Sequence, residues 1–531
     1  MNSEVPENQP ISQEKSPALG KHNLLSSGLV VSSMTMISRV LGLIRDVVLA
    51  NLLGASLMAD VFLFAQKIPN FLRRLFAEGA FAQAFVPVLK DIQEHQSREM
   101  LLIFINRIAG TLSGILVVVT ILGVVGSEVL VSTFGFGFID QHEKYELANT
   151  LLKITFPYIF FISLAGFCGA MLNSVQRFAV PAFAPVLLNV SIIAAALFIA
   201  PGMQQPTRAL AWSIFVAGVL QLAIHLPFLW REGLLPKPQW GWQDEGVKRV
   251  VKLMVPALFG VSVAQINLLI DTMLATSLVT GSISWLYYSD RLLEFPLGVF
   301  GIAIATVILP SLSQQVAQSS ESAYQSTLNW GLQMVLLIGL PAAVGLALLA
   351  EPMMLTIFQH GSFTMDDATR AGWSLVAYSL GLPFFMLIKV LATAFYSRQD
   401  TKTPVKIGII AMTANIILNL ILYRPFGHVG LALATSISAL LNSLLLYIQL
   451  NKLNYFKVSA NWSLFLLRLI SACVVMGTVV WYFSPEIVDW QTGDLWHRIT
   501  NLVVMILVGF AVYIISLFLL GLRIRNIKHK H

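Results

Sequence analysis

Long apolar runs separated by short polar connectors follow one another along almost the whole chain of 531 residues. A helix needs about 20 predominantly apolar residues to cross the hydrocarbon core of a bilayer. Windows of this kind predict about 14 transmembrane helices. The connectors leave no room for a soluble domain. The pattern therefore predicts an all-α polytopic membrane protein.

The composition agrees with this prediction. Hydrophobic residues make up 56% of the chain and charged residues 11%, whereas about a quarter of the residues of a soluble domain are charged. Cys168 and Cys473 both lie inside apolar runs, which predicts buried packing residues and argues against a disulfide framework. Residues 1–21 are polar and contain no apolar core of a signal peptide, so we expect a disordered cytoplasmic tail.

The distribution of Lys and Arg predicts the orientation in the membrane. One set of connectors holds most of these residues, among them Arg98, Arg177 and Arg398, while the alternate set holds few. Because short cytoplasmic loops carry the excess of positive charge, we expect both termini in the cytoplasm. The net charge of +7 then follows from topology and from contact with anionic membrane lipids. It gives little support to nucleic-acid binding.

Two pairs of motifs predict an internal repeat. "FAQAFVPVL" and "IAIATVILPSL" place Pro87 and Pro310 at an offset along the chain that recurs between Pro181 and Pro404. We therefore predict two six-helix lobes related by an internal repeat, with two additional C-terminal helices. Parallel repeats of this kind are a transporter architecture with the substrate site between the repeats. The predicted divisions are the tail (1–21), the N-lobe with helices 1–6 (22–232), the C-lobe with helices 7–12 (233–455), and helices 13–14 with a basic cytoplasmic tail (456–531).

Ionisable residues concentrate in a few of the apolar runs. Each costs roughly 2.5 to 3.5 kcal/mol at the centre of a membrane helix, so such residues usually face a bundle interior or a watery cavity. Asp60, Lys67 and Arg74 recur every seven residues, which places them on one helical stripe. One interpretation is a supporting network of charge pairs that joins the helices, formed by Asp46, Lys67, Arg74, Glu78, Asp290 and Glu294.

Four arginines favour a functional interpretation. Cations outnumber convenient partners in the first two apolar runs, and arginine cannot shed its charge. Guanidinium groups match phosphate oxygens in bidentate geometry, so we predict an anionic guest such as a phosphate or diphosphate headgroup. These residues alone leave open whether that guest is a soluble anion or a lipid. The predicted contacts are Arg39, Arg45, Arg73 and Arg291.

Several long segments carry a family resemblance. The chain closely resembles the MurJ family, also called MviN, from about residue 22 to its C-terminus. This family comprises bacterial lipid II flippases of the multidrug/oligosaccharidyl-lipid/polysaccharide exporter superfamily. The segments that carry the resemblance are "SSMTMISRVLGLIRD", "ADVFLFAQKIPNFLRRLFAEGAFAQAFVPVL", "LLKITFPYIFFISL", "SWLYYSDRLLEFPLGVFGIAIATVILPSLS" and "FYSRQDTKTPVKI".

The resemblance implies 14 helices, a central cationic cavity and a hydrophobic groove bounded by the last two helices. It also implies a transporter of the bacterial inner membrane and no enzyme. By alternating access, this transporter would carry lipid II, the undecaprenyl-diphosphate-linked disaccharide-pentapeptide, from the cytoplasmic to the periplasmic leaflet for cell wall synthesis. Functionally important family positions match Arg39, Arg45, Arg73 and Arg291, together with Asp60 as a further substrate-binding candidate.

The resemblance leaves the energy source open. Some relatives bind sodium between helices 7 and 11, which makes Asp271 and Asp400 weak candidates for sodium ligands. No cofactor is expected, because the chain contains no P-loop pattern. The membrane potential or a sodium or proton gradient would drive transport. Cell-wall synthesis proteins are candidate partners.

Other functions fit the chain less well. A flippase for another polyprenyl-linked glycan would suit the same arginines, and only the matched motifs argue against it. A drug/cation antiporter of the same superfamily would favour acidic and aromatic cavity walls. A membrane glycosyltransferase would need catalytic carboxylates in an extramembrane loop, and a structural scaffold would give no reason for the membrane arginines.

Overall fold

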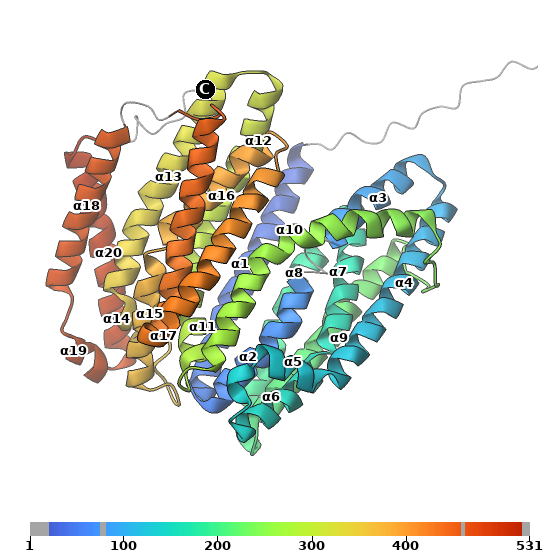
Figure 1. Cartoon of the computed structure of the whole chain (residues 1–531), viewed down its shortest axis with the longest axis horizontal. Helices are drawn as coiled ribbons and strands as arrows, with labels where there is room; N and C mark the ends of the chain where they lie inside the picture. The colour runs from blue at the N-terminus through green and yellow to red at the C-terminus, as the bar shows by residue number, and fades with distance from the viewer. Residues whose placement is uncertain (1–20, 75–80, 458–461, 523–531) are drawn as a thin grey trace, which may run out of the picture.

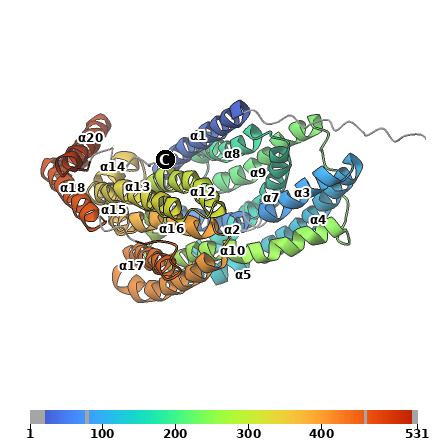
Figure 2. The ribbon, with the colours of Figure 1, turned by 90° about the horizontal axis from the view of Figure 1, so that it is seen from above.

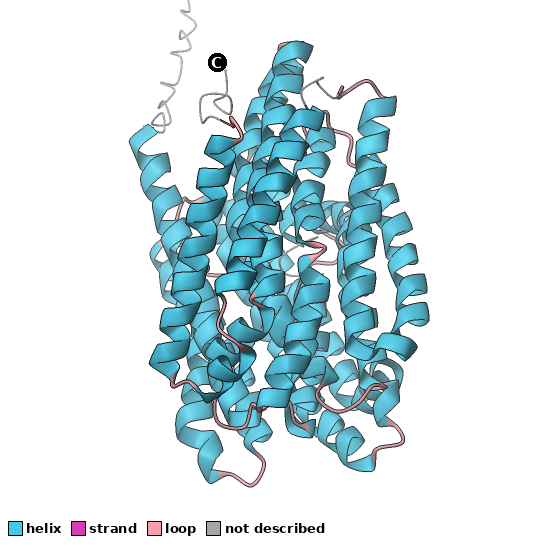
Figure 3. Cartoon of the chain, turned by 90° about the vertical axis from the view of Figure 1, so that its left-hand side faces the viewer, coloured by secondary structure: helices cyan, strands magenta, loops and turns pink. Residues whose placement is uncertain are grey.

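The computed structural model describes residues 21–74, 81–457 and 462–522, and every regular element within these ranges is a helix. The long helices run roughly parallel, with loops gathered at the two ends of the molecule (Figure 3). The start of α1 and the end of α20 lie at the same end (Figures 1 and 3). Residues 1–20 of the predicted tail at 1–21 lie outside the described residues, as do residues 523–531, whereas Lys21 is the first residue of α1.

The N-lobe and the C-lobe each contain a series of helices, and α18 to α20 follow them. In the N-lobe these are α1 (Lys21–Leu53), α2 (Leu57–Arg73), α3 (Phe81–His95), α4 (Arg98–Val125), α5 (Ser127–Phe134), η2 (Phe136–Phe138), α6 (His142–Thr155), α7 (Tyr158–Ser174), α8 (Ala179–Ala194), η3 (Ala195–Ile199), η4 (Ala200–Gly202) and α9 (Pro206–Arg231). The later helices are α10 (Glu245–Thr276), α11 (Ser282–Pro296), η5 (Leu297–Gly301), α12 (Ile302–Ala317), α13 (Glu321–Leu348), α14 (Ala350–Ile357), α15 (Met365–Ser379), α16 (Leu382–Tyr396), α17 (Lys402–Lys452), α18 (Trp462–Phe483), α19 (Ile487–Thr492) and α20 (Leu495–Leu519).

The bounds of the helices repeat with the offset that the prolines predict. Helices α4 and α13 begin and end at positions separated by the same offset as Pro87 and Pro310, and so do α5 and α14. The turns that follow α7 and α16 also match, because Gln176 (φ 64°) and Gln399 (φ 61°) both adopt the left-handed conformation. Non-glycine residues seldom adopt this conformation. Its recurrence at one offset therefore supports the predicted repeat.

Ten helical segments of the described chain are long and apolar enough to cross a membrane. One of them, α17, joins two helices across Gly427, whose φ of 56° and ψ of −134° are not helical. Helices α1 and α10 contain 33 and 32 residues but are not among the ten. Both carry ionisable side chains within their length. The structure thus confirms a polytopic helical membrane protein, while the total of 14 spans stays a prediction.

Packing groups the helices as Figures 1 and 2 show. Helix α1 packs on α8 and α7 on α9, whereas α11 packs on α15 and α16 on α17. Helix α10 contacts both groups, since it packs on α3 and on α17. Helices α18 and α20 pack on each other at one margin of the molecule, beside α13 and α14 (Figure 2). The residue limits of the lobes stay predictions.

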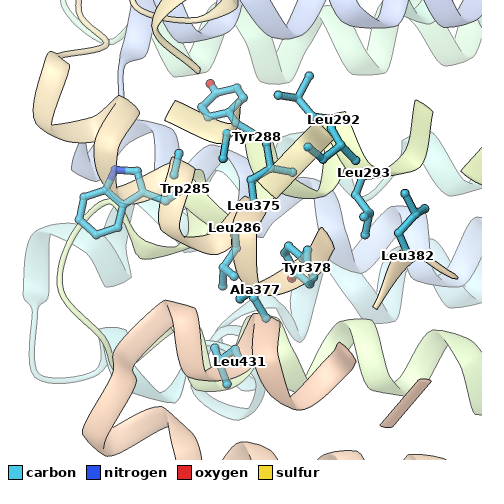
Figure 4. Close-up of a cluster of buried hydrophobic side chains, with 14 of the residues drawn as sticks. Trp285, Leu286, Tyr288, Leu292, Leu293, Leu375, Ala377, Tyr378, Leu382 and Leu431 are labelled. Atoms are coloured by element: carbon cyan, nitrogen blue, oxygen red, sulfur yellow. The ribbon is translucent and has the colours of Figure 1, made fainter. Parts of the chain in front are cut away.

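Helix α11 shows how burial orients the charged residues. Trp285, Tyr288 and Leu292 lie on one face of the helix and are buried against α15 and neighbouring helices (Figure 4). Residues three, four and seven apart share a face, so Tyr287, Arg291 and Glu294 are turned to another side of α11. Burial of the apolar face thereby fixes where these polar side chains point.

Candidate functional site

A cavity of about 980 Å³ lies among helices of both lobes. This volume is at the upper end of the roughly 300 to 1,000 Å³ that is usual for ligand pockets. Six cationic residues and two carboxylates line it within the described part of the chain: Arg39, Arg45, Arg73, Arg74, Arg291 and Lys389, with Asp46 and Glu294. We call these eight residues the cationic wall. The excess of positive charge suits an anionic ligand.

The part of the cavity formed by α7, α8 and α9 is different. Its lining residues include no Asp, Glu, Lys or Arg, and we call this part the neutral wall. It offers polar side chains at Asn173, Asn189, Gln221 and His225, and glycines at positions 166 and 169. Asn173 is exposed on α7 and makes no side-chain hydrogen bond to the described residues. This wall can donate and accept hydrogen bonds without attracting net charge.

Asp46 is the centre of the cationic wall. Its side chain is fully buried, and its Oδ1 accepts hydrogen bonds from Arg45 Nε (2.9 Å), Arg45 Nη2 (2.7 Å) and the Tyr287 hydroxyl (2.8 Å). Its Oδ2 lies 2.8 Å from Arg291 Nε. That contact is an ion pair without a well-directed hydrogen bond, since neither atom satisfies hydrogen-bond geometry. One carboxylate thus holds arginines from α1 and α11 together.

Most of the Arg45 guanidinium is occupied by protein groups. Besides its bonds to Asp46, Nη2 donates to the Tyr287 hydroxyl at 2.9 Å and Nη1 donates to Asn189 Oδ1 at 3.0 Å. The Asn189 amide in turn donates to the Ser38 carbonyl. A guanidinium has five N–H groups, so these bonds leave Arg45 one N–H for a ligand. The cationic and neutral walls meet at the Arg45–Asn189 contact.

Arg39 and Lys389 keep all of their side-chain N–H donors available within the described chain. Within the described chain, neither side chain makes an ion pair or hydrogen bond, and both line the cavity. Lys389 projects from α16 and is exposed. We did not assign Lys389 to the site from the sequence, because a single lysine in an apolar run gives no spacing signal. Its position beside the arginines results from the packing of α16.

Arg73 and Arg74 both line the cavity near the end of α2. Arg73 Nε donates to Asn70 Oδ1 at 3.3 Å, and Arg73 has a further interaction. Arg74 Nη1 lies 3.5 Å from Gln265 Oε1 on α10. The predicted Arg74–Glu78 pair cannot be placed, since Glu78 lies outside the described residues. Division of roles between the two arginines therefore stays a prediction.

A second, smaller pocket of about 110 Å³ adjoins the cationic wall and shares Arg45, Arg74, Arg291 and Glu294 with it. Lys67 and Asp290 line this second pocket, together with Tyr287. Glu294 Oε2 accepts a hydrogen bond from Arg291 Nη1 at 3.0 Å. Four of the predicted supporting charges, Lys67, Arg74, Asp290 and Glu294, therefore line this pocket, while Asp46 lines the larger cavity. The network also contains Tyr287, which lies four residues before Arg291 and whose spacing could have revealed it.

Asp60 lies apart from Lys67 and Arg74, which both line the second pocket. The structure buries its carboxylate against the start of α11, where Gly281 N and Ser284 N donate at 2.7 and 2.9 Å and the Ser284 hydroxyl donates at 2.7 Å. Asp60 is absent from the lining of both pockets. These bonds satisfy free N–H groups of the first turn of α11. They join the lobes, and substrate binding by Asp60 stays a prediction.

Further contacts join the lobes near Asp60. Lys144 Nζ donates to the Thr280 hydroxyl at 2.9 Å, and Ser362 N donates to the Asn51 carbonyl at 2.9 Å. Lys144 belongs to α6, which lies at the lower end of the molecule in Figure 1. The lobes are therefore joined at this end of the molecule.

The two candidates for sodium ligands lie in separate surroundings. Asp271 on α10 accepts hydrogen bonds from Asn419 Nδ2 at 2.6 Å and from the Thr435 hydroxyl at 3.3 Å, both on α17. Asp400 instead accepts from Thr403 N at 3.0 Å at the start of α17. Burial tends to raise the pKa of Asp400, but its hydrogen bonds with Thr403 lower the pKa overall. Within the described residues no three His, Cys, Asp or Glu residues form a metal-binding group.

A helical membrane protein with a large cationic cavity between two repeated lobes belongs to the class of transporters for anionic substrates. Comparison with known proteins narrows this class. The model of the family "Lipid II flippase MurJ" matches residues 49–501. This chain belongs to that family.

Individual relatives agree with the family assignment. A protein of Haemophilus influenzae named "Probable lipid II flippase MurJ" is 52% identical over 94% of this chain and all of its own length. A relative of the same name from Vibrio cholerae is 50% identical over 95% of this chain and 98% of its own length.

Solved structures agree in fold. "Lipid II flippase MurJ, inward closed conformation" has a TM-score of 0.78 at 29% identity and covers 92% of this chain and 98% of its own. An inward-facing multidrug resistance MATE family transporter of the MOP superfamily has a TM-score of 0.68 at 13% identity over 80% of this chain and 98% of its own. This second likeness concerns the fold alone.

Proposed function

We propose that this protein is a lipid II flippase of the bacterial inner membrane. It moves the undecaprenyl-diphosphate-linked disaccharide-pentapeptide from the cytoplasmic to the periplasmic leaflet for peptidoglycan synthesis. The observation that carries this proposal is the 980 Å³ cavity with six cations and two carboxylates in its described lining, in a chain of the MurJ family. The volume favours a large headgroup over a small soluble anion, because a single phosphate would fill little of it.

The two walls of the cavity bind different parts of the substrate. The diphosphate contacts the cationic wall, chiefly through Arg39, Arg73, Arg291 and Lys389, since guanidinium and ammonium groups form strong charge-assisted hydrogen bonds with phosphate. Asp46 holds Arg45 and Arg291 in place. Sugar hydroxyls and amide groups of the headgroup contact the neutral wall, where Asn173 offers a free amide. The protein is not an enzyme in this proposal, since no bond of the substrate changes.

Transport occurs by alternating access of the cavity to the two sides of the membrane. With both termini in the cytoplasm, the end where α1 finishes and α2 begins is periplasmic. The bonds from Gly281 and Ser284 to Asp60, and from Lys144 to Thr280, then join the lobes on the periplasmic side. Substrate release requires these bonds to break. Asp60 thus acts on transport through the closure of the lobes.

The membrane potential contributes to the direction of transport. An interior-negative potential favours the outward movement of an anion by roughly 2.3 kcal/mol per charge per 100 mV. A diphosphate therefore moves outward with the field. A sodium or proton gradient is a second source of energy for the same cycle.

Depletion of this protein in a cell without a redundant flippase tests the proposal. Lipid II exposed on the outer leaflet is measured after depletion and again after rescue by wild type, Arg39→Ala, Arg73→Ala and Arg291→Ala. We expect exposure to fall on depletion, to return with wild type and to stay low with each variant. Normal exposure after depletion would contradict the function, whereas full rescue by all three variants would contradict only the site.

A further inference from the structure

Arg39 lies against a glycine of the other lobe. A Cβ atom added at Gly298 would lie 2.0 Å from Arg39 Nη1, 2.7 Å from Nη2 and 2.8 Å from Cζ. Real Cβ atoms essentially never come within 3.0 Å of a neighbouring heavy atom. The flat guanidinium therefore occupies the place that a side chain at position 298 would take. Both residues line the cavity.

The backbone at Gly298 has an irregular helical form. Gly298 belongs to η5, a π-helical segment that follows Pro296, and Ile302 N donates to the Leu297 carbonyl five residues earlier. Short π segments in longer helices occur often at functional sites. Here the segment connects α11, which carries Arg291, with α12. The C-lobe thus presents Gly298 on the same stretch of chain as a cation of the cavity.

No polar contact of the described residues holds the Arg39 side chain. Arg39 forms no ion pair or hydrogen bond within the described chain, in contrast to Arg45, which is bonded to Asp46, Asn189 and Tyr287. Its placement therefore depends on packing. The contact with Gly298 leaves the N–H groups of Arg39 available to a ligand.

We propose that Gly298 is a positioning residue that seats the Arg39 guanidinium between the lobes for contact with the substrate diphosphate. This inference rests on the proposed function and extends it to a residue that carries no charge. A methyl group at position 298 displaces Arg39 at little cost to the fold, since the group that must move is the far end of a flexible side chain. The lobes together, and not α1 alone, thereby determine where Arg39 lies.

The variant Gly298→Ala tests whether Gly298 positions Arg39. The protein is purified into nanodiscs, and its binding of undecaprenyl diphosphate is measured. We expect binding to weaken about tenfold, as loss of a hydrogen bond to a charged group predicts. Gly301→Ala is the matched control, because it lies in the same π segment and its added Cβ would approach only the side chains of Met386 and Leu297, at 3.2 Å or more. We expect this control to bind like wild type.

A double variant separates positioning from a general structural effect. In the Arg39→Ala background no guanidinium remains to be displaced, so Gly298→Ala should cause no further loss of binding. An equal loss in both backgrounds would overturn the proposal, as would wild-type binding by Gly298→Ala. If Gly298→Ala does not accumulate in the membrane, the Arg39→Ala/Gly298→Ala variant should accumulate normally, and its failure would also overturn the seat.

The same experiment distinguishes failure of the positioning role of Gly298 from failure of the proposed function on which it rests. Wild-type protein that binds neither undecaprenyl diphosphate nor lipid II would contradict the proposed function and the seat with it. If wild type binds undecaprenyl diphosphate and Gly298→Ala binds it equally well, the positioning role of Gly298 is contradicted and the proposed function is not.

Discussion

The cationic wall and the neutral wall of the cavity differ in how their side chains are held. In the cationic wall, Asp46 on α1 pairs with Arg45 and with Arg291 on α11, and it also accepts a hydrogen bond from Tyr287 in the adjoining pocket. In the neutral wall, Asn173 is exposed and makes no side-chain bond to the described chain, and His225 bonds to the Gln221 carbonyl of its own helix. Charges in a membrane need partners that fix them, whereas neutral polar groups do not need such partners to the same degree.

This difference predicts which residues can be substituted without disturbing the other side chains of the site. A change at Asp46, Arg45 or Arg291 disturbs several neighbours at once, because one carboxylate serves two arginines. A change in the neutral wall removes one contact with a ligand.

Replacement of Asp46 should be the most damaging change. Asp46→Ala leaves the buried Arg45 beside the half-buried Arg291 without their shared partner, and breaking the buried Arg45–Asp46 pair in this way costs about 3 to 5 kcal/mol. Thermal unfolding in detergent measures the loss. Glu294→Gln is the control, since its partner Arg291 and Glu294 itself are 33% and 46% exposed, and we expect less than about 1 kcal/mol there. If Asp46→Ala and Glu294→Gln are equally stable, Asp46 is not the central partner of the cationic wall.

Loss of an available cation should weaken binding more than it weakens the fold. Arg39→Ala and Lys389→Ala should each reduce affinity for lipid II and for undecaprenyl diphosphate by about 10- to 100-fold, the equivalent of a hydrogen bond to a charged group. Arg370→Ala is the control, because Arg370 pairs with Asp366 away from the cavity. Native mass spectrometry gives the affinities. Unchanged binding of both lipids by Lys389→Ala would remove Lys389 from the site.

Asp60 lies outside both walls, so its replacement should not distinguish the two lipids. Asp60→Asn weakens the bonds from Gly281 and Ser284 that join α2 to α11, at a cost of about 2 kcal/mol. Affinities for lipid II and undecaprenyl diphosphate should change by the same factor, and transport should change through the closure of the lobes. A selective loss of lipid II binding would instead favour direct contact between Asp60 and the headgroup.

The neutral wall should show the smallest and most selective effect. Asn173→Ala removes one neutral hydrogen-bonding group, which predicts a loss of lipid II affinity of about 2- to 10-fold. Affinity for undecaprenyl diphosphate, which has no sugar or peptide, should not change. Gln318→Ala provides an exposed polar control outside the cavity. An equal loss of affinity for both lipids would indicate that the neutral wall also contacts the diphosphate, and would contradict the distinction between the two walls.

Much of the fold could be predicted from the sequence, since hydropathy and helical spacing are local properties. The apolar runs indicated a polytopic membrane protein, and two pairs of prolines gave the offset that the bounds of α4 and α13 repeat. Arg39, Arg45, Arg73 and Arg291, the four arginines named from the sequence, all line the cavity. Their contacts with substrate stay predictions.

Contacts between distant helices could not be predicted from hydropathy and helical spacing. Asp60 and Arg74 share a predicted stripe, yet Asp60 bonds to Gly281 and Ser284 on the other lobe. Lys389 looked isolated in its apolar run, and packing of α16 brought it to the cationic wall. Helical spacing places side chains on a face but does not say which helix that face meets.

The sequence by itself determined that this protein spans a membrane, that it repeats, and that it carries more cations in its interior than helix packing alone explains. These properties depend on residue type and on spacing along one chain. Tertiary structure alone decided that Asp46 serves two arginines and that Gly298 lies beneath Arg39. The Asp46–Arg291 and Arg39–Gly298 contacts join residues that lie far apart along the chain, and they arise only when the two lobes pack against each other.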